Sequence, residues 1–381
     1  MRNLSTYLLG TLALGCAVLS GCNDAEYDKL ANQAFILQTN TNANSSQKLT
    51  IGIDAVSTDI NVRLSEPAAE TSTYKLVSDA EALSDFNKKN ETAYTQLPDD
   101  AYTLSAQELT IAANSSVSDP VQLTVKPFTQ QLKDSGKKYA LAFRLESTDG
   151  KASVLPSGSI MVYVIDQVVI QPVIVLTRQN TVACTLKQTY NLDEWTVEFN
   201  INKHILLTGI GQGNNQALFG ASPSEIYIRF GDAPIEGNRL QIKTRGTQMN
   251  SQSLFNVDTW YHLAFVCNGS KLYLYVNGVL DNSIDVPSNT NVTSALSVYS
   301  NSSYELGDAM YSEVRIWSKA RSQKEIANNM YACDPASPGL IAYWKMNEGS
   351  GNKLTDASGN GHDAVTSGNP TWVQNVRIDG K

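Results

Sequence analysis

Residues 258–280 read DTWYHLAFVCNGSKLYLYVNGVL, and this stretch decides the fold of the C-terminal half of the chain. It contains two runs of alternating residues on either side of the Asn-Gly-Ser tripeptide at 268–270, which is turn chemistry. In the second run the aliphatic residues share one face of a strand, whereas Tyr273 and Tyr275 share the other. The stretch therefore predicts an antiparallel hairpin with one face on a core and a tyrosine pair facing outward.

The same period-two alternation continues through most of the chain. It is clear in LTIGIDAVSTDINVRL at 49–64, where Ile53 is expected on the core face, in WTVEFNIN at 195–202 and in SEIYIRF at 224–230. Glycine, proline and asparagine separate these runs, as expected for turns between short strands. The pattern predicts an all-β chain built from two β-sandwiches.

Two segments have helical rather than strand periodicity. One is DAEALSDFNKKN at 79–90, and the other is SQKEIANNMY at 322–331. In the second segment Ser322 is followed three residues later by Glu325, the spacing of a capping box in which each side chain satisfies a free backbone N–H of the other. Ile326 and Met330 share one face of this second segment and are expected to dock it on a sheet.

Length and composition restrict the classes of function. A chain of 381 residues is long enough for two domains of ordinary size. The hydrophobic fraction of 42% and the charged fraction of 17% are those of globular domains. A formal charge of −8 and the lack of a basic stripe argue against nucleic acid as a partner, because phosphate binding requires clustered Lys and Arg. Uncharged ligands such as sugars fit this composition better.

The N-terminus reads MRNLSTYLLGTLALGCAVLSGC, with one Arg before a short apolar run. This order indicates a signal peptide at 1–21 rather than a membrane span. Its last residues, Leu-Ser-Gly-Cys, resemble the lipobox of bacterial lipoproteins, which implies cleavage before Cys22 and acylation of its thiol. The acidic NDAEYDK that follows is similar to export signals of Bacteroidetes-type lipoproteins. We expect a tether at 22–32, an outer-membrane lipid partner and exposure at the cell surface, with a periplasmic orientation as the alternative.

Residues 33–166 contain the strands of an immunoglobulin-like β-sandwich. The segment also resembles an N-terminal domain of unknown function in surface lipoproteins from glycan-utilisation loci. The matching features are Asn87 after an aromatic residue, Leu97-Pro98 before a strand, and a strand that begins at Tyr139 and ends in Asp149-Gly150. The resemblance implies a spacer between a lipid anchor and a glycan-active module.

Residues 167–381 carry three motifs in a recognisable order. Trp260 and His262 begin a strand, Val-Asn-Gly at 276–278 turns a hairpin, and Arg-Ile-Trp at 315–317 precedes the short helix. Together these motifs resemble the laminin-G-like, concanavalin A-type jelly roll. The family usually has Asp-Glu before Val-Arg-Ile-Trp, whereas this chain has Ser-Glu. The resemblance implies a jelly roll that binds carbohydrate.

Catalytic patterns are weak in this sequence. Glycosidases need two carboxylates that face each other across a cleft, and the Glu-x-Asp-x-x-Glu string of jelly-roll glucanases is absent. Glu194 and Glu198 share a strand face, so a hydrolase with atypical carboxylates is kept as an alternative. His262 is expected to be packed rather than to act as a base. We therefore predict no enzymatic activity.

Aromatic side chains that alternate with core residues are the best ligand-binding candidates, because sugar rings stack on them. We select Tyr227, Arg229, Tyr273 and Tyr275 as glycan-binding residues. The predicted function is non-catalytic glycan binding beside neighbouring glycan-uptake proteins. The alternative is an adhesin that binds a host protein through the jelly roll.

The segment WKMNEGSGNKLTDASGNG at 344–361 raises the question of a metal. Asp356, Ser358 and Asn360 have the spacing of the first EF-hand positions, although the bidentate Glu and the flanking helices are absent. Together with Asp308 they form a candidate structural calcium site; no other cofactor is predicted. The last segment resembles the strand that usually opens this jelly roll, so we expect it to close a sheet beside the first strand of the domain.

Overall fold

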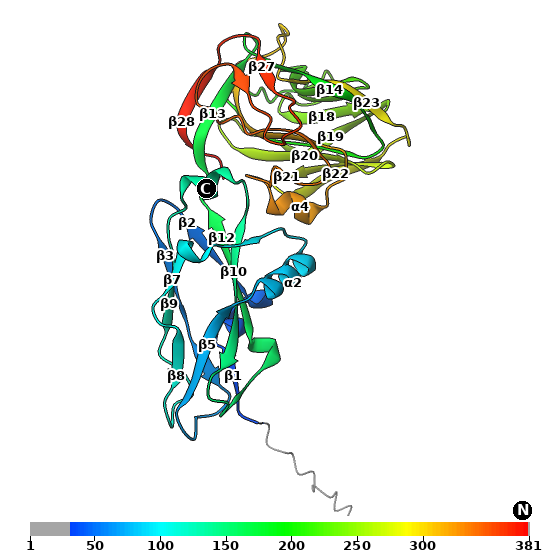
Figure 1. The fold of residues 1–381 in the computed structure, drawn as a ribbon. Coiled ribbons are helices and arrows are strands. Elements are labelled where there is room, and N and C mark those ends of the chain that lie inside the picture. Colours follow the sequence, from blue (N-terminus) through cyan, green and yellow to red (C-terminus); the bar gives the residue numbers. More distant parts are fainter. Residues whose placement is uncertain (1–30, 380–381) are drawn as a thin grey trace, which may run out of the picture.

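A computed structural model describes residues 31–379 of the chain, and all structural statements below refer to them. The predicted signal peptide and Cys22 lie outside this range. Figure 1 shows two β-rich bodies, one above the other, with helix α4 of the upper body turned toward the lower one. The all-β fold predicted from the alternation is confirmed.

Three sheets form the first body. The strands of the largest lie in the order β2-β12-β10-β5-β8, with β6 beside β10. Their bounds are β2 Ser46–Ile51, β5 Ser72–Ser78, β6 Thr95–Gln96, β8 Glu108–Ile111, β10 Tyr139–Ser147 and β12 Ile160–Gln167. The two smaller sheets contain β1 Gln33–Ile36, β4 Val62–Leu64 and β11 Ser153–Val154, and β3 Val56–Ile60, β7 Tyr102–Leu104 and β9 Val121–Val125. They enclose one apolar core between them.

The helix predicted at 79–90 is present as α2, Ala80–Asn90. Asp79 caps it by accepting a hydrogen bond from the backbone N–H of Ala82, 2.8 Å away. Its residues Ala82 and Leu83 pack on the outer face of β10 and β12. The first body also has two shorter helices that the sequence pattern did not predict, α1 Gln38–Thr41 and α3 Gln130–Asp134.

Two eight-stranded sheets form the second body. We call the first the hairpin sheet, because it contains the predicted hairpin: β13 Ile170–Thr177, β15 Trp195–Lys203, β20 Tyr261–Cys267, β21 Lys271–Val276, β22 Val279–Asp285, β24 Asp308–Trp317, β25 Leu340–Trp344 and β28 Thr371–Arg377. We call the second the Tyr227 sheet: β14 Val182–Leu192, β16 Gln216–Pro223, β17 Ile226–Phe230, β18 Arg239–Thr244, β19 Thr247–Leu254, β23 Asn291–Val298, β26 Lys353–Leu354 and β27 Ala364–Thr366.

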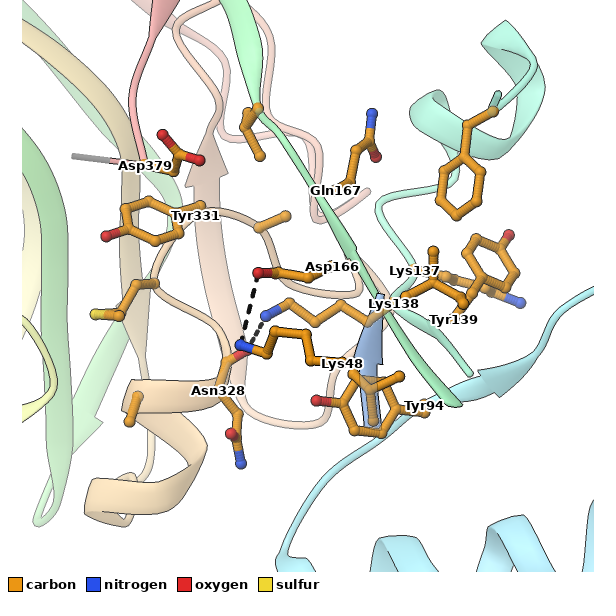
Figure 2. A pocket seen from close by; sticks show the side chains of 17 residues that line it. Lys48, Tyr94, Lys137, Lys138, Tyr139, Asp166, Gln167, Asn328, Tyr331 and Asp379 are labelled. Carbon is orange, nitrogen blue, oxygen red and sulfur yellow. Dashed lines mark hydrogen bonds and ion pairs between the residues drawn. The ribbon is translucent and has the colours of Figure 1, made fainter. Parts of the chain in front are cut away.

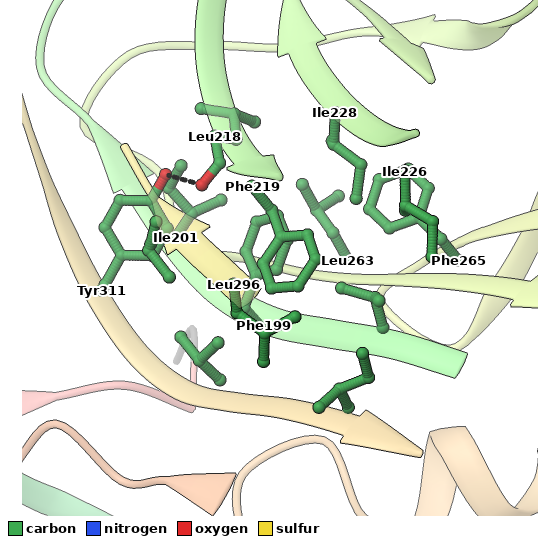
Figure 3. Close-up of a cluster of buried hydrophobic side chains, with 14 of the residues drawn as sticks. Phe199, Ile201, Leu218, Phe219, Ile226, Ile228, Leu263, Phe265, Leu296 and Tyr311 are labelled. Atoms are coloured by element: carbon green, nitrogen blue, oxygen red, sulfur yellow. Dashed lines mark hydrogen bonds between the residues drawn. The ribbon is translucent and has the colours of Figure 1, made fainter. Parts of the chain in front are cut away.

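Aromatic and branched side chains from the facing sides of these two sheets fill the core of the second body. Figure 3 shows Phe199 and Phe265 from the hairpin sheet against Phe219 from the Tyr227 sheet. The ring centroids of Phe199 and Phe219 lie 6.5 Å apart. The Tyr311 hydroxyl, buried in this core, donates a hydrogen bond to the carbonyl of Leu218 over 3.3 Å. Sandwich packing of this kind needs one apolar face per sheet, which the alternation supplies.

The end of the chain closes the hairpin sheet as predicted. Strand β28 pairs antiparallel with β13, the first strand of the second body, with Ile170 opposite Arg377. Figure 1 shows β13 and β28 side by side at the edge of the upper body. The predicted helix is also present, as α4 Gln323–Asn328, and both hydrogen bonds of the Ser322–Glu325 capping box form.

One detail of the predicted core is wrong. Ile53 was placed on the face of Leu49 and Ile51, but β2 ends at Ile51 and Ile53 is 85% exposed. The alternation continued in the sequence past the point where the backbone turns. Within residues 31–379, no helix has the length and apolarity needed to cross a membrane.

Candidate functional site

The four predicted ligand residues do not form one groove. Ile226 and Ile228 of β17 point into the core, so Tyr227 and Arg229 lie on the outer face of the Tyr227 sheet. By the same argument Tyr273 lies, with Tyr275, on the outer face of the hairpin sheet. The four residues therefore lie on the outer faces of two different sheets, because alternation assigns a residue to a face without saying which sheet the strand joins.

Helix α4 covers the tyrosine pair of the hairpin sheet. Ile326 of the helix packs in a cluster with Tyr275, and Tyr275 is only 8% exposed. The rings of Tyr273 and Tyr275 stack on each other with centroids 6.3 Å apart. This pair therefore holds the helix on the sheet rather than offering a free surface to a ligand.

The outer face of the Tyr227 sheet has a continuous row of residues that lie opposite one another on neighbouring strands. Lys243 is opposite Tyr227, Tyr227 is opposite Gly220, and Gly220 is opposite Ser297. Directly paired residues on antiparallel strands share a face, so the whole row points away from the core. Ser297 is in turn opposite Ala183, which extends the row to a fifth strand.

A groove of about 400 Å³ lies along this row, lined in part by Gly220, Ser222, Tyr227 and Ser297. The glycine makes the hollow: a Cβ atom at Gly220 would lie 2.8 Å from Ser297 Oγ. Small residues on one side and a tyrosine ring on the other leave space for a flat, hydroxyl-bearing molecule against the ring. Stacking on Tyr227, with hydroxyl groups nearby, is the chemistry that sugar binding requires.

Polar side chains hold this face rigid. Asn215 Oδ1 accepts hydrogen bonds from the Tyr227 hydroxyl at 2.9 Å and from Arg229 Nη1 at 2.8 Å. Arg229 Nε donates to Gln241 Oε1 over 2.9 Å, and the Gln241 amide donates to Asn250. This chain of hydrogen bonds therefore holds the Tyr227 ring in one orientation.

Arg229 plays a different part from the one predicted. It is 7% exposed, and its Nη2 lies 2.7 Å from Asp232 Oδ2. Its positive charge is therefore paired with a carboxylate, and its N–H donors already have acceptors. It positions Tyr227 and Asn215 rather than meeting a ligand directly. Desolvation raises the pKa of the Tyr227 hydroxyl, with neighbouring Arg229 acting in the opposite direction. The hydroxyl thus stays protonated at neutral pH and donates to Asn215.

Glu198, the carboxylate of the hydrolase alternative, is fully buried on the outer side of the hairpin sheet. Its Oε1 accepts hydrogen bonds from Trp317 Nε1 at 2.7 Å and from the Arg321 guanidinium, and Arg315 Nη1 lies 3.4 Å away. His262 Nε2 is 3.4 Å from Glu198 Oε2, and the ring is 1% exposed. The prediction that His262 is packed is confirmed.

The electrostatics of this cluster oppose acid–base chemistry. Burial by itself would raise the pKa of Glu198, but Arg321 and Arg315 hold it well below its usual range. Burial lowers the pKa of His262, which keeps the imidazole neutral. A glycosidase acid needs a raised pKa and access to substrate, and Glu198 has neither. The cluster is a structural network.

The four predicted calcium ligands do not converge. Asp356 lies near Val314 of β24, because it is paired with Trp344 and Trp344 is paired with Val314. Asp308 is the first residue of β24, six residues before Val314. That separation is about 20 Å along a strand. Asp308 instead contacts His204, with 2.6 Å between Oδ1 and Nδ1. The prediction that Asp308 joins this site is wrong.

The other three predicted ligands organise their own loop. Asp356 Oδ1 accepts hydrogen bonds from the backbone N–H of Tyr343 at 3.0 Å and from the Ser358 hydroxyl at 2.6 Å, and Oδ2 accepts one from the N–H of His362. The Asn360 amide donates to the carbonyl of Leu340. Among the described residues no three His, Cys, Asp or Glu side chains gather as a metal site would require.

Comparison with known proteins agrees with this geometry. Residues 178–327 match the model of the concanavalin A-like lectin/glucanases superfamily. The second body is a concanavalin A-like domain. A separate family model, described as an N-terminal domain, matches residues 28–152. The resemblances drawn from the Trp-x-His and Arg-Ile-Trp motifs and from the first 166 residues are thereby confirmed at the level of domains. No curated protein sequence matches the chain.

Among solved structures, a protein from Bacteroides ovatus described as a candidate carbohydrate-binding protein has a TM-score of 0.59 at 19% identity. The match covers 91% of this chain and 100% of that one, so the two share a fold. EndoBT-3987 from Bacteroides thetaiotamicron has a TM-score of 0.29 at 18% identity, over 35% of this chain and 30% of its own. A pentraxin from Limulus polyphemus has a TM-score of 0.34 at 9% identity, over 53% of this chain and 98% of its own. These last two are partial likenesses.

Sequence reasoning singled out Tyr227 but not the residues around it. Gly220, Ser297 and Asn215 were not among the predicted ligand residues. Register between β16, β17 and β23 brings them together, and no short motif in the sequence encodes that register. The one available signal was a glycine inside a strand pattern, which often marks a close approach of another group.

Proposed function

We propose that the concanavalin A-like domain binds a glycan, without cleaving it, in the groove beside Tyr227. The observation that carries this proposal is the row in which an oriented tyrosine ring lies opposite Gly220 and next to the exposed Ser297. The domain family and the shared fold with a carbohydrate-binding candidate support it. The burial of Glu198 supports the non-catalytic half of the proposal.

The protein would present this groove at the outer surface of a bacterial cell, anchored to outer-membrane lipid through Cys22, and would pass glycan to neighbouring uptake proteins. Figure 1 supports such a display, since β1, the first described strand, lies at the end of the first body away from the concanavalin A-like domain. A Cys22→Ser variant would then fail to incorporate labelled fatty acid, while the unaltered chain would incorporate it.

Isothermal titration of the protein against a panel of plant and host glycans tests the binding site. For a glycan that binds, Tyr227→Ala should lower the affinity about fivefold, because an aromatic stack contributes roughly 1 kcal/mol. Gly220→Val should lower it at least as much by filling the groove. Gly220 has an ordinary backbone angle, and the atom that an added Cβ would meet is the Ser297 hydroxyl oxygen, which can rotate away, so valine is compatible with the strand.

Tyr304→Ala is the matched control, because Tyr304 is 60% exposed but does not line the groove. Unchanged affinity in the Tyr227 and Gly220 variants would contradict the assigned site. Loss of affinity in Tyr304→Ala alone would place the binding site at Tyr304 instead. Ile210 is also an exposed apolar side chain, at 71%. Those exposed apolar side chains favour the second candidate function, adhesion to a host protein. The absence of binding to any glycan in the panel would strengthen that candidate.

A further inference from the structure

Two cavities lie between the two domains and meet. The first, of about 260 Å³, is shown in Figure 2 and is lined by residues of both domains. The second, of about 580 Å³, lies beside helices α2 and α4. Tyr94, Lys138 and Asn328 line both cavities, so the two are adjacent, and together we call them the interdomain cleft. The volume of the second cavity is in the range of small-ligand sites, about 300–1,000 Å³.

Specific contacts between the domains hold the walls of the cleft. Glu91, just after α2, lies 3.0 Å from the Lys324 ammonium and accepts a hydrogen bond from the Ser322 hydroxyl over 3.0 Å. Gly136 lies against Pro335 so closely that a Cβ atom would be 2.9 Å from the proline ring. These contacts form independently of any ligand, and therefore the cleft exists before a ligand enters.

Lys138 is the central polar group of the cleft. Its ammonium carries three N–H donors and donates to the backbone carbonyl of Asn328. Desolvation lowers the pKa of Lys138 to about 8, opposed by the charge of Asp166 and reinforced by Arg315 and Lys48. An ammonium that has lost water and has donors to spare is stabilised by an anion.

The other charged groups at the cleft leave room for such an anion. Lys48 pairs with Asp166 at 3.5 Å, and Asp379 lines the first cavity next to Tyr331. Arg321 lines the second cavity, but its guanidinium is paired with Glu198. Lys138 is thus the buried cation that both cavities share.

Tyrosines complete the walls. Tyr94 comes from the first domain and Tyr331 from the second, and in Figure 2 they lie on either side of the Lys138 ammonium. Both side chains are partly exposed. An aromatic wall takes the C–H face of a sugar ring, while amide groups such as those of Gln167 and Asn328 take its hydroxyls.

We propose that the interdomain cleft binds an acidic sugar, with its carboxylate against the Lys138 ammonium and its ring between the tyrosines of the two domains. This site is separate from the groove beside Tyr227. It uses residues of both domains, so ligand binding stabilises their contact.

Titration of the full chain with glucuronate, with glucose and with acetate tests the proposal. Glucuronate should bind at least about tenfold more tightly than either comparison ligand, because only it provides both the charge and the ring. Its affinity should also fall between about pH 7 and about pH 9, as the Lys138 ammonium loses its proton in this range.

Lys138→Gln removes the charge and keeps a donor for the Asn328 carbonyl, so the variant should fold and bind glucuronate at least about tenfold more weakly. Lys133→Gln, at an exposed position on α3 outside the cleft, should bind like the unaltered protein. Tyr227→Ala should also bind glucuronate normally, which separates this site from the groove. Equal binding of glucose or acetate, or normal binding by Lys138→Gln, would overturn the proposal.

Discussion

At the scale of single residues, Glu198 shows how burial changes the meaning of a carboxylate. In the sequence it shares a strand face with Glu194 and could belong to a catalytic pair. In the fold it accepts hydrogen bonds from Trp317 and Arg321 and is closed off from solvent. A buried carboxylate with two guanidinium partners is stable as an anion and cannot exchange protons with a substrate.

Glu198→Gln should therefore destabilise the concanavalin A-like domain rather than affect any hydrolysis. Removing one partner from a buried ion cluster costs about 3–5 kcal/mol, because Arg321 would lose its carboxylate partner and Arg315 would keep only Glu313. Urea unfolding measures the loss. Glu194→Gln, at an exposed position, is the control and should change stability by no more than about 0.5 kcal/mol.

The pH dependence of this effect has a defined sign. The pKa of Glu198 is lower in the folded protein than its ordinary value of 4.5, so its contribution is present at neutral pH. It is lost as the pH falls below about 4.5, where the unfolded chain takes up the proton first. The stability gap between the unaltered protein and Glu198→Gln should then narrow in acid; a constant gap would contradict the ionised assignment.

At the scale of elements, the C-terminal loop and strands close the second domain. The loop after β25 is held by Asp356, whose two carboxylate oxygens accept hydrogen bonds from backbone N–H groups on both sides of the turn. The glycines at 359 and 361 have positive φ angles, 79° and 76°, which the tight turn requires. The Asp356 carboxylate thus organises the loop through hydrogen bonds to its backbone.

This arrangement predicts that the domain does not depend on calcium. Excess EDTA should leave its melting temperature unchanged, and added calcium should not raise it, because the Asp356 oxygens already have donors. Asp356→Ala should lower the melting temperature by several degrees, since the backbone N–H groups of Tyr343 and His362 would lose their acceptor. A drop in melting temperature with EDTA alone would restore the calcium site.

At the scale of the whole molecule, the two outer faces of the concanavalin A-like domain have different uses. The outer face of the hairpin sheet carries α4, whose N-cap residue Ser322 contacts Glu91 of the first domain. The outer face of the Tyr227 sheet carries the groove. One outer face thus contacts the first domain, and the other carries the groove. The boundary predicted between residues 166 and 167 stays a prediction.

The sequence by itself determined the elements and the domain types. Alternation, turn residues and caps act over a few residues, so the hairpin about 268–270, helix α2 and the capping box of α4 could be read directly. The Trp-x-His and Arg-Ile-Trp motifs indicated the family of the second domain because they occur in a fixed order.

Only the tertiary structure decided which residues meet. It placed Gly220 and Ser297 beside Tyr227, put Tyr275 under α4, and surrounded Glu198 with arginines from more than a hundred residues away in the sequence. Register between strands and burial depend on the free energy of the whole packed core, summed over many distant contacts. No local pattern contains that sum. For this reason the sequence could supply a short set of candidate residues but could not say which of them lie together.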